Sequence, residues 1–206
     1  MGIITDISFQ KNKKRVNIFV DGEFVSGLSF ETAVKNGLKK GLSIEEHKLS
    51  DIIKESETLS AFSAGLDIIA ISSKTSEDVK QKLVRKGFST EVASLAVEKL
   101  KNYKYIDDLA YAKNYVKINS SKSKRELENK LRNKGVCADD IQAALLLVSD
   151  DEEMNNALIH ARKYVSRKTF DERVRNNLFA SLARKGYSLD TIYSVIDIIK
   201  QEIKDQ

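Results

Sequence analysis

The 206-residue sequence contains no proline and no tryptophan, and it has only one cysteine and two histidines. The single cysteine, Cys137, excludes an internal disulfide bond. The histidines, His47 and His160, stand far apart in the sequence without the spacing of metal ligands, so no zinc site is predicted. The absence of proline, in a chain rich in lysine, glutamate, leucine, alanine and isoleucine, favours a mainly helical fold.

Long apolar runs and glycine-rich phosphate loops are also missing. No stretch of about 18 apolar residues is present, so no membrane-spanning helix is predicted. Residues 1–6 lack the features of a signal peptide, and Asp6 stands where a myristoylation signal needs serine or threonine. We therefore expect a cytoplasmic protein with no membrane partner. Because no nucleotide-binding loop is found, no cofactor is predicted.

What the chain does contain is charge. Charged residues make up 32% of it, with a formal net charge of +5 and a pI near 9.1. Between residues 74 and 134 there are 16 lysines and arginines against 8 aspartates and glutamates. Such an excess permits an anionic partner, but many helices carry a solvated charged face. Charge alone leaves both interpretations open.

The first 57 residues differ from the rest and are predicted to form an N-terminal extension. Residues 3–9 and 15–20 are predicted strands, and Asp21-Gly22 is typical of a two-residue hairpin turn. Two short amphipathic helices are expected at residues 30–39 and 44–55. The prediction is a β-hairpin or small three-stranded sheet covered by helices.

The remainder of the chain shows an internal repeat marked by the dipeptide Lys-Gly, at Lys86-Gly87, Lys134-Gly135 and Lys185-Gly186. When the glycines are aligned, the residues eight and four before them, and one, six and ten after them, are apolar in every copy. The two preceding positions share one helical face, and glycine tolerates the left-handed conformation that ends a helix. Each copy is therefore predicted as a helix, a tight turn and a second helix.

The residue two positions after each glycine is predicted to cap the second helix. These residues are Ser89, Cys137 and Ser188. Cysteine is a poor cap, so the middle copy should be the weakest.

A third helix is predicted ahead of each pair. Residues 112–116 and 161–165 are similar to one another, and residues 64–68 are their equivalent in the first copy. The fold class is therefore mainly α, with three tandem three-helix repeats that should pack in series. The expected domains cover residues 1–57, 58–103, 104–149 and 150–206.

Two acidic clusters, Asp107-Asp108 and residues 150–153, invite a metal or acid–base interpretation. Both stand where a helix is expected to begin, and carboxylates there cap amide groups and favour the helix dipole. We interpret them as structural. No catalytic residue and no metal site is predicted, and the protein is not expected to be an enzyme.

Twelve basic residues are predicted to bind an anionic partner, either nucleic-acid phosphate or an acidic protein. They are Lys113, Lys117, Lys124, Arg125, Lys130, Arg132, Arg162, Lys163, Arg167, Lys168, Arg173 and Arg175. Two helices joined by a glycine turn also suggest a helix–turn–helix DNA reader, but three copies at a fixed period favour a repeat scaffold. The aromatic residues Phe88, Phe179 and Tyr187 are expected at core or turn positions rather than in an exposed stacking row.

Three segments carry a resemblance to a known family. The segment from Tyr105-Ile106-Asp107-Asp108 to Lys134-Gly135-Val136 resembles the central motif of the RecX family, bacterial regulators of the recombinase RecA. Residues 182–188 resemble the C-terminal repeat of that family, and residues 17–24 resemble its N-terminal extension. One departure is Lys74-Thr75, where the family commonly has Arg-Ser. We expect it to weaken a contact of the first repeat without breaking the pattern.

The resemblance implies a non-enzymatic regulator that lies in the groove of a RecA filament on single-stranded DNA. It would limit filament growth, ATP turnover and strand exchange in recombination, DNA repair and the SOS response. Inhibition is the expected direction, although the residues do not decide it, and direct contact with single- or double-stranded DNA is left open. A monomer is expected. The alternative is a stand-alone nucleic-acid-binding protein of the helix–turn–helix type.

Overall fold

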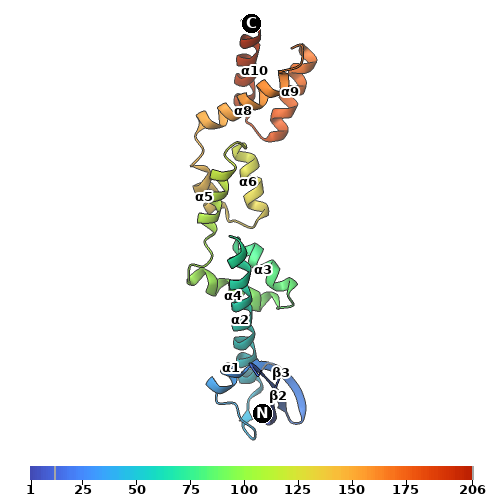
Figure 1. Cartoon of the computed structure of the whole chain (residues 1–206), viewed down its shortest axis with the longest axis vertical. Coiled ribbons are helices and arrows are strands. Elements are labelled where there is room, and N and C mark those ends of the chain that lie inside the picture. Colours follow the sequence, from blue (N-terminus) through green and yellow to red (C-terminus); the bar gives the residue numbers. More distant parts are fainter. Residues whose placement is uncertain (12, 206) are drawn as a thin grey trace. The chain divides into compact units, whose positions relative to one another are not determined.

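The N-terminal segment forms a four-stranded antiparallel sheet, one strand more than expected. The computed structural model describes residues 1–11 and 13–205. The strands of this sheet, which lies in the blue part of the chain in Figure 1, pair in the order β3 (Glu23–Ser29), β2 (Arg15–Val20), β1 (Gly2–Phe9) and β4 (Ser43–Ile44). Because β4 is only two residues long, it offers no alternation of side chains by which the sequence would reveal it.

The hairpin between β2 and β3 turns at Asp21-Gly22, as predicted. The φ angles of these residues are 52° and 89°, and two successive positive values are those of a type I′ turn. Helix α1 (Phe30–Lys35) follows and is shorter than expected. It ends early because the chain reverses at Gly37, whose φ is 62°.

The helix expected at residues 44–55 is instead the start of one continuous helix, α2 (Glu46–Ile71). A break was expected after residue 55, where polar residues follow. These residues form hydrogen bonds with other residues of the chain. Ser56 Oγ accepts the N–H of Ser29 at 2.9 Å, and Thr58 Oγ1 donates to the carbonyl of Lys54 at 2.7 Å. Because both hydroxyls find partners, they do not interrupt the helix.

The three helix pairs flank the three glycines as predicted. They are α3 (Ser76–Arg85) with α4 (Thr90–Asn102), α6 (Lys124–Asn133) with α7 (Ala138–Leu145), and α9 (Glu172–Lys185) with α10 (Leu189–Lys204). The φ angles of Gly87, Gly135 and Gly186 are 98°, 75° and 88°. In each turn the residue after glycine donates its N–H to a leucine carbonyl five residues back, at 3.2 to 3.3 Å. This is the hydrogen bond of a Schellman turn.

The predicted caps are also confirmed. The hydroxyls of Ser89 and Ser188 accept backbone N–H groups of their helices at 3.2 and 3.1 Å, whereas Cys137 makes no such side-chain bond. The third helices are α5 (Asp108–Ile118) and α8 (Asp150–Val165). Both acidic clusters lie at their starts, where Asp107 caps α5 and Ser149 forms a capping box on α8.

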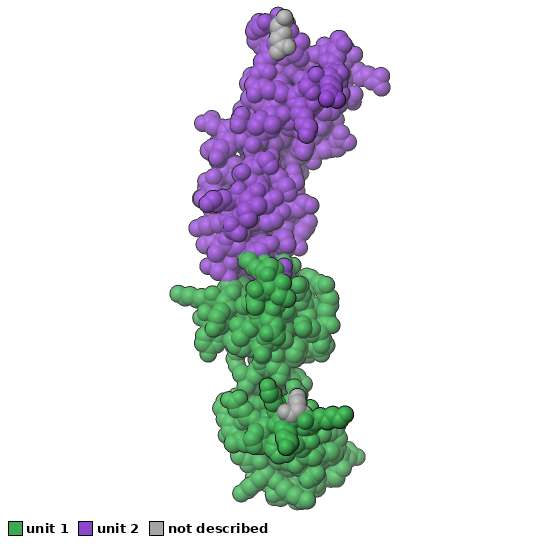
Figure 2. Space-filling view, viewed as in Figure 1, with its two compact units in different colours: residues 1–73, 78–106 green, residues 74–77, 107–206 purple. Residues whose placement is uncertain are grey.

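Buried hydrophobic side chains form four clusters, one beneath the sheet and one in each group of helices. The chain divides into two compact units (Figure 2), residues 1–73 with 78–106, and residues 74–77 with 107–206. The four domains expected from the sequence stay a prediction, which the four separate clusters favour.

Within the second unit, two equivalent hydroxyl groups close the glycine turns. Thr75 Oγ1 donates to the carbonyl of Lys134 at 2.7 Å, and Ser123 Oγ donates to the carbonyl of Lys185 at 2.5 Å. Both side chains are buried, with exposed fractions of 0% and 1%. Threonine at position 75 therefore supplies the same bond as the serine at position 123.

Carboxylates form further hydrogen bonds beside these two hydroxyl contacts. Asp108 accepts the N–H and the Oγ–H of Ser76 at 2.8 and 2.6 Å, at the start of α3. Glu153 accepts the N–H of Lys124 at 3.0 Å, at the start of α6. Each acid therefore binds the N-terminus of a helix from the preceding repeat, a role that the sequence did not indicate.

Candidate binding surface

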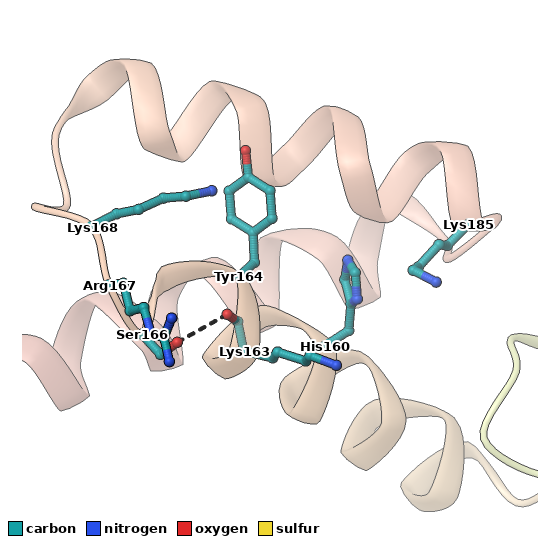
Figure 3. A pocket seen from close by; sticks show the side chains of 7 residues that line it. All are labelled: His160, Lys163, Tyr164, Ser166, Arg167, Lys168 and Lys185. Carbon is teal, nitrogen blue, oxygen red and sulfur yellow. Dashed lines mark hydrogen bonds between the residues drawn. The ribbon is translucent and has the colours of Figure 1, made fainter.

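An open groove lies at the C-terminal end of α8 (Figure 3). Its volume is about 810 Å³. The residues that line it are His160, Lys163, Tyr164, Ser166, Arg167, Lys168 and Lys185. Four of these described residues are lysine or arginine and none is acidic, so the groove suits an anionic ligand.

The groove follows from the helical spacing of α8. His160 and Tyr164 stand four residues apart on α8, which places them on one face, and Arg167 follows in the turn after the helix ends at Val165. Beyond the helix, the Nζ of Lys168 lies 3.3 Å from the centre of the Tyr164 ring, a cation–π contact that Figure 3 shows. The Oγ of Ser166 donates to the carbonyl of Lys163 at 3.1 Å and stabilises the turn.

Among the described residues that line the groove, His160 is the one whose ordinary pKa lies near neutral pH. Its Nε2 lies 3.0 Å from the Oγ of Ser181 on α9. Partial burial holds the pKa of His160 below its ordinary value of 6.5, and the charges of Lys185 and Lys163 lower it further. An anion in the groove would offset these charges and raise the pKa of His160 again.

The groove contains three of the twelve basic residues predicted from the sequence, Lys163, Arg167 and Lys168. Arg162 points elsewhere, because its Nη2 lies 2.6 Å from Glu202 Oε1 on α10. This pairing raises the pKa of Arg162 and lowers that of Glu202. Arg175 lines a separate pocket on α9 and α10, and Arg173 is exposed.

The other predicted residues belong to α5 and α6. Lys113, Lys117 and Lys130 are exposed. Lys124 pairs with Asp150 at 2.6 Å, and Arg132 pairs with Glu128 on its own helix. The hydrogen bond from Lys124, together with the lysine charge, lowers the pKa of Asp150.

Arg125 is exposed, but its stem has a second role that the sequence did not predict. A Cβ added to Gly186 would lie 2.9 Å from the Cβ of Arg125, so this side chain covers the third glycine turn. The structure does not gather the twelve residues into one site.

Sequence reasoning missed four residues of the groove, which are His160, Tyr164, Ser166 and Lys185. His160 and Tyr164 share a face of α8, and this spacing was a usable signal. Lys185 was assigned only to its turn. It reaches the groove because α9 packs against α8, which is a tertiary contact.

No helix in residues 1–11 and 13–205 is long and apolar enough to cross a membrane. Within the same described part of the chain, no group of three or more histidine, cysteine, aspartate or glutamate side chains could hold a metal ion.

The fold and this surface define a class: proteins of tandem three-helix repeats with an N-terminal sheet and a cationic groove. Two family models match the chain, the regulatory protein RecX N-terminal domain over residues 2–45 and the RecX second three-helix domain over residues 107–145. A regulatory protein RecX of Clostridium botulinum (strain Alaska E43 / Type E3) is 34% identical over 205 residues, covering 95% of each chain. The chain belongs to the RecX family of regulatory proteins.

Other relatives agree. A regulatory protein RecX of Bacillus subtilis (strain 168) is 30% identical over 98% of this chain and 79% of its own. A crystal structure of a regulatory protein RecX superposes with a TM-score of 0.71 at 26% identity, covering 96% of this chain and 100% of the other. RecX from Lactobacillus salivarius, at 23% identity and a TM-score of 0.64 over 70% of this chain, has the same fold.

Proposed function

We propose that this protein regulates a RecA-type recombinase by binding to the filament that the recombinase forms on single-stranded DNA, most simply as an inhibitor. The observation that carries the proposal is the groove on α8, where Lys163, Arg167, Lys168 and Lys185 stand together without an acidic residue among the described lining. Such a groove fits acidic side chains or phosphates of a filament. The protein acts as a ligand, without chemistry of its own, in the cytoplasm where such filaments form.

Cations on consecutive repeats support this proposal. Besides the groove on α8, exposed lysines stand on α5 and α6, including Lys113, Lys117 and Lys130. One chain can therefore contact an extended partner at several points, and linked contacts act at high effective concentration. Inhibition should then saturate below one molecule per recombinase subunit.

The test is a titration of recombinase ATPase activity on single-stranded DNA. Lys163→Glu with Arg167→Glu reverses the charge at the groove, and we expect it to require roughly tenfold more protein for half-inhibition. The matched control is Lys39→Glu with Lys40→Glu, which makes the same charge change at two exposed residues of the N-terminal region. Equal inhibition by the groove variant and the wild-type protein would contradict the assignment of the groove.

A second titration separates the filament regulator from a stand-alone nucleic-acid-binding protein. A filament regulator loses its effect when more filament is supplied, meaning recombinase and DNA together. A protein that only sequesters single-stranded DNA loses its effect when DNA alone is added, and its binding to DNA weakens steeply with salt. Relief by DNA alone that equals the relief by filament would overturn the proposed function.

A further inference from the structure

Three aromatic rings meet on the surface of the first unit, where α2 faces the end of α4. The ring centre of Phe62 on α2 lies 5.8 Å from that of Tyr103 and 6.4 Å from that of Tyr105, and the two tyrosine rings are 6.2 Å apart. Tyr103 is 68% exposed and Tyr105 is 56% exposed. The sequence analysis expected no exposed row of stacking aromatic residues, but these two tyrosines present their rings to solvent.

The backbone between the two tyrosines is held in an unusual conformation. Helix α4 ends at Asn102, and Lys104 has a φ of 60°, although the three Lys-Gly turns use glycine for such angles. Hydrogen bonds close this turn, from Lys104 N to the Lys101 carbonyl at 2.8 Å and from Tyr105 N to the Leu100 carbonyl at 2.9 Å. A side chain in the left-handed region is disfavoured, so the fold holds a lysine between two tyrosines at the expense of local backbone strain.

Lysines stand beside the rings at the end of α4, although the exposed Asp107 follows two residues after Tyr105. Lys101 and Lys104 are exposed and alternate with the tyrosines along the chain. On α2, the residues three and four positions from Phe62 are uncharged: Thr58, Leu59, Gly65 and Leu66. The surface therefore combines open aromatic faces with positive charge.

This combination matches single-stranded nucleic acid better than the alternatives. Unstacked bases pack on aromatic rings while neighbouring lysines contact the phosphates. A duplex keeps its bases stacked inside, and an acidic protein surface would engage the lysines but gain little from the ring faces. We propose that Tyr103 and Tyr105, with Lys104 between them, bind single-stranded nucleic acid directly, with a base stacked on the Tyr103 ring. This goes beyond the proposed function because it requires no recombinase.

The first experiment measures binding of a fluorescein-labelled 12-residue oligothymidine to the full-length protein by fluorescence anisotropy. We expect Tyr103→Ala to weaken binding about tenfold, which lies within the range for one base stacked on an aromatic ring. Tyr103→Phe keeps a ring and should bind like the wild-type protein. Salt should weaken binding of every variant, because phosphates contribute.

The matched control is Phe24→Ala in the N-terminal sheet. Phe24 is 59% exposed, and its ring centre lies 5.8 Å from that of Phe19, so it resembles Tyr103 in exposure and in ring packing. Its neighbours Asp21 and Glu23 are acidic rather than basic. Phe24→Ala should leave the affinity for oligothymidine unchanged.

The second experiment reports stacking itself. The chain has no tryptophan, so Tyr103→Trp introduces a single fluorophore of that kind. Its emission should be quenched by oligothymidine and not by a duplex of equal length. Wild-type affinity in Tyr103→Ala, or no quenching of the tryptophan, would overturn the proposal. It would also be overturned if Tyr103→Ala weakened binding only when recombinase is present. Because the two direct-binding measurements contain no recombinase, their failure leaves the proposed function untouched.

Discussion

The three Lys-Gly turns have the same backbone, but their surroundings differ. Around Gly87, no described atom other than those of the glycine and its two chain neighbours lies within 4 Å of where a Cβ would stand. At Gly135 that position is filled by the Glu77 side chain, and at Gly186 by the side chain of Arg125. Glu77 and Arg125 occupy equivalent positions in consecutive repeats. The same turn is therefore left uncovered at Gly87 and is covered by another side chain at Gly135 and Gly186.

The lysines of the two covered turns differ in the same way. Both carbonyls accept a buried hydroxyl, from Thr75 at Lys134 and from Ser123 at Lys185. The Lys134 ammonium lies 5.7 Å from the centre of the Tyr111 ring, whereas Lys185 lines the groove with His160. The hydrogen bond to the backbone carbonyl is therefore the same in both turns. Only the third turn contributes a side chain, that of Lys185, to the groove.

The largest effect should come from filling a covered turn. Gly135→Val forces a β-branched residue into positive φ and into the Glu77 side chain, and we expect a loss of about 3 kcal/mol of unfolding free energy. Gly87→Val meets only the backbone strain and should lose about 1 to 2 kcal/mol. Urea denaturation followed by circular dichroism measures both. Equal losses would mean that Glu77 does not cover the turn.

The next largest effect should come from removing a hydroxyl that bonds to a covered turn. Ser123→Ala deletes both the cap on Glu126 N, at 3.1 Å, and the bond to the Lys185 carbonyl, so we expect a loss of about 2 kcal/mol. Ser89→Ala is the control, since it deletes a helix cap at an uncovered turn and should lose about 1 kcal/mol. If both variants unfold at the same urea concentration, the hydrogen bond from Ser123 to the Lys185 carbonyl contributes nothing to the unfolding free energy.

A smaller change in stability is expected from Arg125→Glu with Arg132→Glu. Both side chains are exposed, so the unfolding free energy should fall by at most about 1 kcal/mol, including lost packing of the Arg125 stem on Gly186. Binding to the recombinase filament should weaken clearly, as measured by co-sedimentation against Lys39→Glu with Lys40→Glu. Wild-type binding would show that this face of α6 points to solvent in the complex.

The smallest effect concerns His160. Lys185→Gln removes a charge that lowers the pKa of His160, so that pKa should rise, whereas Lys134→Gln at the equivalent turn should leave it unchanged. An NMR titration of the histidine resonances measures both variants, with His160→Gln used for assignment. A rise in the pKa of His160 in the Lys134→Gln variant would show that Lys134 and Lys185 do not differ in their effect on His160.

The lowered pKa also gives the pH dependence of stability a sign. Below about pH 6.5 the unfolded chain takes up a proton at His160 that the folded protein resists, so the unfolding free energy falls as pH falls. His160→Gln should reduce this fall. Thermal unfolding of the wild-type protein and of His160→Gln at pH 7 and pH 5.5 measures this fall. An equal fall in stability in both proteins would contradict the lowered pKa of His160.

The N-terminal region shows where prediction from sequence stopped. The Asp21-Gly22 hairpin was predictable because two positive φ angles need those residue types. The strand β4 and the length of α2 were not predictable, because a two-residue strand has no pattern. The serine and threonine at the expected break in α2 are satisfied by partners that only the fold supplies.

The sequence by itself determined the local structure of the repeats. Apolar spacing, glycines and serine caps act within one or two helical turns, so the helices and their ends could be predicted from neighbouring residues. The tertiary structure alone decided which turns are covered and which cations stand together. Asp108 reaches Ser76, and Lys185 reaches the groove on α8, across more than twenty residues of chain. Such contacts depend on how helices pack, and the spacing of residues within one helix carries no record of its neighbours.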